Sequence, residues 1–152
     1  MQGSIKLLGV VVLVLSVIAL LVGAAFIYMG FSKQDVIVNA MKAEKITMGA
    51  FGGDAKNVID NIDEAQKAAD TVREHRHAIA PTYGDLLGGK KYDPTNPLQL
   101  TYAQAMNLEN YLYLGVASLG LVQVVLASGG FMLITALGLA AVGAALLLLS
   151  KK

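Results

Sequence analysis

The sequence predicts an all-α membrane protein with two transmembrane helices and a helical extracytoplasmic domain between them. Hydrophobic residues make up 55% of the 152-residue chain. They gather in two runs: 26 uncharged residues separate Lys6 from Lys33, and 41 separate Glu109 from Lys151. A bilayer core about 30 Å thick needs about 20 apolar helical residues. Each run is therefore long enough to cross a membrane.

The distribution of charge predicts the orientation. All eleven acidic residues and nine of the twelve basic residues lie from Lys33 to Glu109, so this segment has a net charge of −2. The remaining basic residues, Lys6, Lys151 and Lys152, flank the two apolar runs at the ends of the chain. Basic flanks stay on the cytoplasmic side of a membrane. We therefore expect both termini in the cytoplasm and the central segment outside it.

Residues 1–32 are predicted to form the first transmembrane helix. Its apolar part, residues 7–31, is 25 residues long, whereas a signal peptide has an apolar region of roughly 7–15 residues. We therefore expect a retained anchor. Small residues recur at every seventh position, at Gly9, Ser16, Gly23 and Gly30. A stripe of this kind lets a second helix approach closely in lipid. No proline follows, so the helix is expected to continue several turns beyond the bilayer.

Residues 33–110 are predicted to form the extracytoplasmic helical domain. After a glycine-rich loop, a second helix is expected from Asp54 as its N-cap. One face of this helix carries a narrow apolar seam, the external seam, with spacings of three and four residues; its members are Val58, Ile62, Ala65, Ala69 and Val72. The seam is predicted to pack on the extensions of the transmembrane helices, or alternatively on another protein. A proline- and glycine-rich loop occupies residues 81–100.

Residues 111–152 are predicted to form one long C-terminal helix whose membrane span is about 131–150. The helix is expected to begin upstream, at the sequence "TYAQAM", with Thr101 or Asn96 as its cap. Small residues again follow a seven-residue register, at Gly115, Gly129, Ala136 and Gly143. The alternative is a hairpin at residues 128–130, which would give three transmembrane helices. A hairpin would reset the register and export Lys151, so the continuous helix is preferred. Its apolar residues 112–128 would then lie outside the bilayer and need a cover.

The chain offers little catalytic chemistry. The only histidines, His75 and His77, lie two residues apart and point in different directions on a helix, so they make a poor metal pair. The glycines before Lys90 lack the spacing of a phosphate-binding loop. Neither apolar run contains a charged residue, which argues against a pump or transporter. We expect no catalytic residue, metal or cofactor, and no nucleic-acid partner.

Two stretches, "ADTVREHRHAIAPTYGDLLGGKKYDPTNP" and "YAQAMNLENYLYLGVASLG", carry a resemblance to a family. The chain resembles a group of uncharacterised small bacterial membrane proteins, which are often mislabelled aromatic ring-opening dioxygenases. These proteins have an N-terminal span, an external helical domain and a long C-terminal apolar helix. The resemblance implies a bacterial plasma membrane location, and it implies no activity.

These features predict a non-catalytic accessory or structural subunit of a membrane protein assembly. Its partners would be membrane lipid and other membrane protein subunits, which its external helices and apolar C-terminal helix would contact. The alternatives are a homo-oligomeric assembly or channel and, less favoured, a metal-dependent enzyme that uses His75 and His77.

Overall fold

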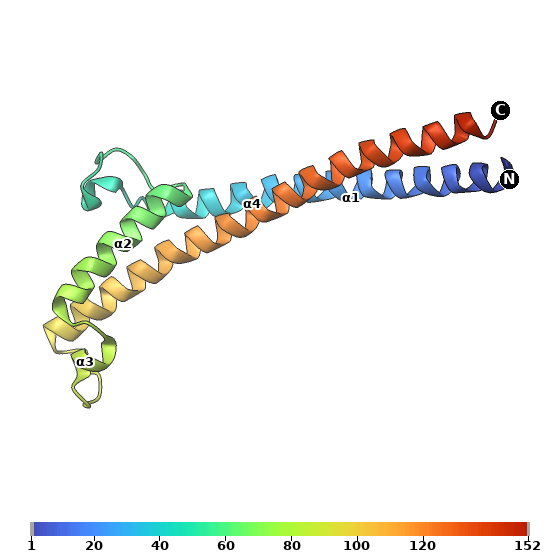
Figure 1. The fold of residues 1–152 in the computed structure, drawn as a ribbon. Helices are drawn as coiled ribbons and strands as arrows, with labels where there is room; N and C mark the ends of the chain where they lie inside the picture. Colours follow the sequence, from blue (N-terminus) through green and yellow to red (C-terminus); the bar gives the residue numbers. More distant parts are fainter. Residues whose placement is uncertain (1, 152) are drawn as a thin grey trace. The chain divides into compact units, whose positions relative to one another are not determined.

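The computed structural model describes residues 2–151, and every element in that range is helical (Figure 1). The element order is α1 (Gln2–Ala43), the short 3-10 helix η1 (Met48–Phe51), α2 (Ile62–Ile79), α3 (Tyr83–Leu87) and α4 (Pro97–Leu149). The described range contains no β-strand, and Thr47 and Val58 form an isolated antiparallel bridge. Met1 and Lys152, the outermost residues of the two predicted terminal segments, lie outside the described residues.

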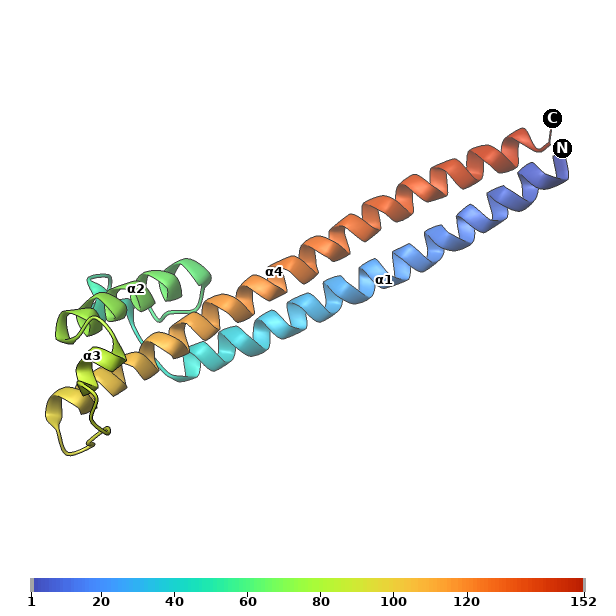
Figure 2. The same cartoon turned by 60° about the horizontal axis from the view of Figure 1, so that its bottom comes forward.

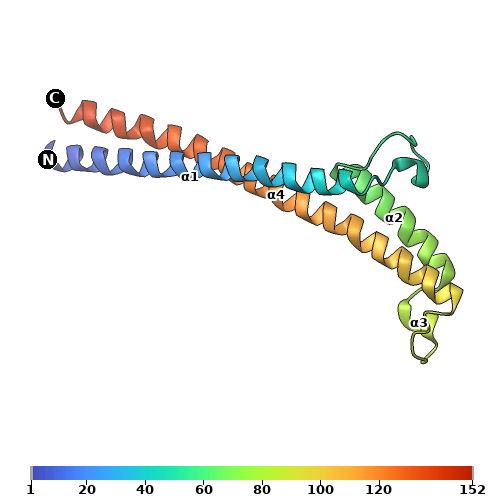
Figure 3. The same cartoon turned by 180° about the vertical axis from the view of Figure 1, so that it is seen from behind.

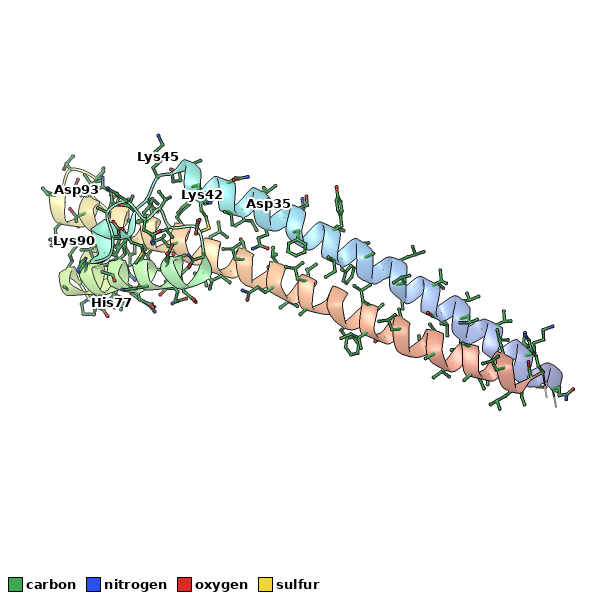
Figure 4. All side chains as sticks on the ribbon, turned by 90° about the horizontal axis from the view of Figure 1, so that it is seen from above. Asp35, Lys42, Lys45, His77, Lys90 and Asp93 are labelled. Atoms are coloured by element: carbon green, nitrogen blue, oxygen red, sulfur yellow. The ribbon has the colours of Figure 1, made fainter. Side chains whose placement is uncertain are left out.

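The chain divides into two compact units. The paired-helix unit consists of Met1–Gln34 and Leu121–Lys152, and the central unit consists of Asp35–Gly120. The first boundary lies two residues beyond the predicted limit at residue 32, and the second lies ten residues beyond residue 110. The labelled charged side chains Asp35, Lys42, Lys45, Lys90 and Asp93 all belong to the central unit (Figure 4).

Two helices in the described range are long and apolar enough to cross a membrane, namely α1 with 42 residues and α4 with 53. Helix α4 runs without interruption through Gly129 and Gly130, so the prediction of one continuous helix is confirmed and the hairpin is not found. Glycine costs about 1 kcal/mol in a helix interior in water, but membrane helices tolerate it. Helix α1 continues to Ala43, as expected from the absence of a breaking residue after Lys33.

Helix α4 begins at Pro97, directly after Asn96, one of the two predicted caps. The Asn96 side chain accepts hydrogen bonds from the backbone N–H groups of Leu98 and Gln99, at 3.0 and 3.3 Å. Proline suits the first helical position because its missing N–H would have no partner there. Of the two predicted caps, the structure therefore selects Asn96. Thr101 lies inside the helix, where its hydroxyl donates to the Pro97 carbonyl.

The predicted start of the second helix at Asp54 is wrong, because α2 begins at Ile62 with Asn61 as its N-cap. The Asn61 side chain accepts from the Glu64 N–H at 3.0 Å. The preceding residues are extended: the Ile59 N–H donates to the Ile46 carbonyl and the Met48 N–H to the Asn57 carbonyl. Residues 54–57 form a turn closed by the bond from the Asn57 N–H to the Asp54 carbonyl, and residues 57–59 bond to residues 46–48, so neither stretch is helical. Val58 therefore lies in the bridge to Thr47, outside the helix.

Candidate functional site

The small residues of the two helices face each other in the paired-helix unit, where α1 and α4 lie side by side (Figure 2). A Cβ atom built on Gly23 would lie 3.0 Å from the Gly129 carbonyl oxygen, and one on Gly129 would lie 3.0 Å from the Gly23 carbonyl oxygen. Gly9 and Gly143 are opposed in the same way, at 3.3 and 3.1 Å. Such distances leave no room for a side chain between the two backbones.

Large side chains fill the space beside each glycine. Leu147 covers Gly9, Leu133 covers Gly23, Leu126 covers Gly30, Ile27 covers Gly129 and Leu13 covers Gly143. Each pair therefore consists of a glycine on one helix and a branched aliphatic side chain on the other. This complementarity supplies van der Waals contact, which is the main attraction between helices in lipid.

Ser16 and Ala136 complete the series. Both are buried, and the Ser16 hydroxyl donates a hydrogen bond of 2.8 Å to the Ala136 carbonyl. A carbonyl oxygen has two lone pairs, so it can accept this bond in addition to its helical one. Ser128 and Thr135, by contrast, bond to carbonyls of their own helix. Ser16 thus provides a side-chain hydrogen bond from α1 to α4.

The external seam lies in the core of the central unit, where α2 runs beside α4 (Figure 3). Ala65, Ala69 and Val72 belong to this core, and Ile62 packs against it. Helices α1 and α4 contribute Met41, Leu112 and Leu119 to the same cluster, and the stripe residue Gly115 faces Met41. Leu112 and Leu119 belong to the apolar stretch that was expected to lie outside the bilayer. The chain itself buries both side chains in this core.

Arg76 and Glu109 form a buried ion pair between α2 and α4. The Arg76 Nε lies 2.7 Å from a Glu109 carboxylate oxygen, and the two side chains are only 12% and 9% exposed. The hydrogen bond to Glu109 raises the pKa of Arg76, and burial opposes that rise. Arg76 also donates to the hydroxyl of the buried Tyr102 and lies over its ring. The guanidinium is therefore held by a carboxylate and a phenol at once.

A second arginine repeats the arrangement one turn earlier on α2. Arg73 donates to both Asp70 and the Tyr113 hydroxyl, and its guanidinium carbon lies 5.1 Å from the centre of the Tyr113 ring. The Tyr113 hydroxyl in turn donates to Asp70 at 2.6 Å. The two arginines, two tyrosines and two carboxylates, which we call the arginine–tyrosine network, join α2 to α4. Arginine suits this role because its planar group both stacks and donates several hydrogen bonds.

The histidines do not form a metal centre with neighbouring groups in residues 2–151. His75 and His77 are exposed on α2, and His77 is labelled in Figure 4. The His77 Nε2 lies 3.2 Å from Arg76 Nη2. Arginine can only donate, so this nitrogen accepts. No group of three or more potential metal ligands occurs in the described part of the chain.

The loop from α3 to α4 is ordered by its own hydrogen bonds. The Thr82 side chain caps α3 at Asp85, and Gly88 ends the helix with a φ of 53°. Asp93 accepts hydrogen bonds from the backbone N–H and hydroxyl of Thr95 at 2.9 and 2.6 Å. These bonds lower the pKa of the Asp93 carboxyl. The loop thus has a defined conformation.

Helix α3, this loop and the start of α4 expose four large apolar side chains, which we call the loop surface: Tyr83, Tyr92, Leu98 and Leu100. An open pocket of about 550 Å³ lies in the same segment. Two lysines, two aspartates and two leucines line it together with Asn96 and Gln99. The segment therefore offers apolar side chains beside a polar pocket without net charge.

Comparison of the chain with protein-family models, curated proteins and solved structures gives no match.

The arginine–tyrosine network was missed from the sequence, although a signal for it exists. Tyr102, Glu109 and Tyr113 are separated by seven and four residues, which places them on one face of a helix. Arg73 and Arg76 are three residues apart and share a face of α2. A single acidic residue between two tyrosines, in a helix that is otherwise apolar or uncharged, indicates a buried basic partner.

Proposed function

We propose that α1 and α4 cross a bacterial plasma membrane as an antiparallel pair, with both termini in the cytoplasm and the central unit outside. The facing small residues support this packing, since lipid offers no hydrophobic gain for helix association and close backbone contact must supply it. The uncharged part of α1 between Lys6 and Lys33 is 26 residues long, or about 39 Å of helix. That length suits a hydrocarbon core of about 30 Å with some tilt.

The contacts of α1 also favour a longer span on α4 than residues 131–150. Gly30, close to the outer end of the apolar run, lies against Leu126. We therefore place the α4 span at about residues 121–149, the part of α4 that belongs to the paired-helix unit. The exposed apolar side chains of this unit, such as Leu21, Leu121 and Phe131, then contact lipid.

This topology predicts opposite labelling of two single cysteines. The chain has no cysteine of its own, so Lys90→Cys and Lys151→Cys each introduce one thiol. In intact cells a membrane-impermeant maleimide is expected to label Lys90→Cys and to leave Lys151→Cys unlabelled until the membrane is opened. Labelling of Lys151→Cys from outside, or protection of Lys90→Cys, would contradict the topology.

We further propose that the protein is a non-catalytic accessory subunit that uses its central unit to bind another membrane protein. This proposal rests on one observation: the loop surface exposes apolar side chains on a loop whose conformation is fixed by its own hydrogen bonds. Exposed tyrosine and leucine side chains are the kind that protein interfaces bury. The hydrogen bonds within the loop and the packing of Tyr83 near Tyr102, with ring centres 6.2 Å apart, reduce the entropy lost when a partner binds.

Site-specific photo-crosslinking in native membranes tests this function. A photoreactive side chain at Tyr92 or Leu98 is expected to give one and the same heterologous product, and that partner is expected to co-purify with the unmodified chain. Lys67, which is exposed on α2, is the matched control and should give no such product. Leu98→Ser with Leu100→Ser should abolish co-purification while the helical content stays unchanged.

The crosslinking pattern also separates the alternative of a homo-oligomer. If the crosslinked products contain only this chain, at the mass of a dimer or higher oligomer, the protein assembles with itself and is not an accessory subunit of another protein. Absence of any product from the loop surface would remove the proposed interface.

A further inference from the structure

We infer that the paired-helix unit holds one anionic diacyl phospholipid at the end of its apolar run, with an acyl chain in a groove and the headgroup phosphate on Lys33. The groove has a volume of about 220 Å³ and is lined by Met29, Gly30, Lys33, Leu121, Val122 and Val125. All six residues belong to the paired-helix unit. The inference rests on the proposed membrane insertion and is independent of the proposed protein partner.

The groove has the chemistry of an acyl-chain site. Its lining is wholly apolar, since Lys33 contributes only its hydrocarbon stem. Leu126 fills the space beside Gly30, so an acyl chain would lie along the outer side of this contact. Sites for complete small molecules have volumes of about 300–1,000 Å³, so this groove suits a segment of one chain better than a compact soluble ligand.

Charge selects the headgroup. Lys33 ends the 26-residue uncharged run of α1, and no acidic side chain in residues 2–151 forms an ion pair with its ammonium group. Lysine stems lie along apolar surface and carry the ammonium group to the interface. The phosphate of an anionic lipid would therefore pair with the Lys33 ammonium group, for which the described residues provide no carboxylate.

Aromatic side chains place the groove at the level of the headgroups. Tyr28 and Phe31 are exposed on α1 within one turn of the groove residues Met29 and Gly30. Exposed aromatic residues of membrane helices gather at the interface between hydrocarbon and water. The phosphate and the ammonium group of Lys33 would therefore lie at the same depth.

Native mass spectrometry of the detergent-solubilised full chain tests the site with two probes, phosphatidylglycerol and phosphatidylcholine of the same acyl composition. We expect one phosphatidylglycerol per chain, and weaker retention of phosphatidylcholine. A basic residue near a membrane surface contributes about 1 kcal/mol toward anionic lipid, so Lys33→Gln should reduce affinity about five-fold. Lys33→Arg should keep it.

Two further variants separate this site from general electrostatic attraction. Lys6, at the other end of the same uncharged run, is the matched control, and Lys6→Gln should leave retention unchanged. Val125→Trp fills the groove and should abolish retention of phosphatidylglycerol without change in helical content. Glycerophosphoglycerol, the headgroup without acyl chains, should not compete.

Three results would overturn the inference: equal loss in Lys6→Gln and Lys33→Gln, full retention in Val125→Trp, or competition by the free headgroup. A second copy of the chain in place of the lipid would appear as a dimer in the same spectra and would also overturn it. Labelling of Lys90→Cys and Lys151→Cys reports on the topology alone, so failure of the membrane orientation and failure of the lipid site are distinguishable.

Discussion

Replacing Gly129 with leucine is expected to separate α1 from α4 in the paired-helix unit, whereas the same replacement at Gly130 is expected to leave the pair intact. A Cβ atom at Gly129 would lie 3.0 Å from the Gly23 carbonyl and 3.0 Å from the Ile27 side chain. A Cβ atom at Gly130 would meet nothing within 4 Å. The two variants therefore have the same composition and differ only in the face of the helix that they enlarge.

The size of the effect follows from the cost of overpacking. Extra methylene groups in a well-packed contact cost about 1–3 kcal/mol, and here the obstacle is a backbone carbonyl, which cannot rotate away. Leucine at position 129 should therefore reduce the population of paired helices by roughly ten-fold or more. At position 130 the new side chain enters open space and adds apolar surface suited to lipid.

Disulfide formation measures the pairing in membranes. Ser16→Cys with Ala136→Cys places one thiol on each helix at a buried contact, where the Ser16 hydroxyl now bonds the Ala136 backbone carbonyl. An intramolecular disulfide is expected to form. Addition of Gly129→Leu should reduce its formation rate at least ten-fold, and addition of Gly130→Leu should have little effect. Equal rates in the two variants would show that the helices do not pack through this face.

Replacing Glu109 with leucine is expected to produce the largest loss of stability in the central unit. The change leaves the Arg76 guanidinium buried without its carboxylate, and removal of one partner of a buried ion pair costs about 3–5 kcal/mol. A domain of 60–100 residues loses roughly 4–8 °C in Tm for each kcal/mol. The Tm of the full chain in detergent, followed by circular dichroism, should therefore fall by more than about 10 °C.

A double variant tests whether the two residues act as a pair. Two well-packed apolar residues can replace a buried ion pair with little loss, so Arg76→Leu with Glu109→Leu should recover most of the stability that Glu109→Leu removes. Glu74→Leu on the exposed face of α2 is the matched control and should change stability by less than about 0.5 kcal/mol. Additive losses from the two single changes would show that Arg76 and Glu109 are not coupled.

The long helices could be predicted from the sequence because their signals are local. Three signals can be recognised in the sequence without any knowledge of the tertiary structure. They are twenty or more consecutive uncharged residues, small residues at every seventh position, and the absence of proline after Lys33. The continuity of α4 through Gly129 and Gly130 followed from the same register. The resemblance to small bacterial membrane proteins stays a prediction.

The start of α2 and the pairing within the arginine–tyrosine network depend on contacts between segments that are apart in the sequence. Apolar spacings of three and four residues continue from Ile62 back to Val58, which suggests a helix. In the structure residues 57–59 are extended instead, because their backbone groups form hydrogen bonds with residues 46–48. Asn61 followed by Glu64 matches the start of a capping box and would have given the correct boundary. The neighbours of Arg76 in the sequence do not identify its partner, because Glu109 lies 33 residues away.

The seven-residue spacing of the stripes has a consequence for the register of the two helices. A slide of α1 by one repeat, about 10 Å, would set Ser16 against Gly143, Gly23 against Ala136 and Gly30 against Gly129, so small residues would still meet small residues. The stripe therefore specifies which faces of the helices meet, but it allows a second alignment of the two helices along their length. In the proposed topology the lysines remove this degeneracy, because a slide would draw Lys6 or Lys33 into hydrocarbon at a cost of about 2.5–3.5 kcal/mol. The small-residue faces hold the two helices together, and Lys6 and Lys33 fix the alignment of one helix along the other.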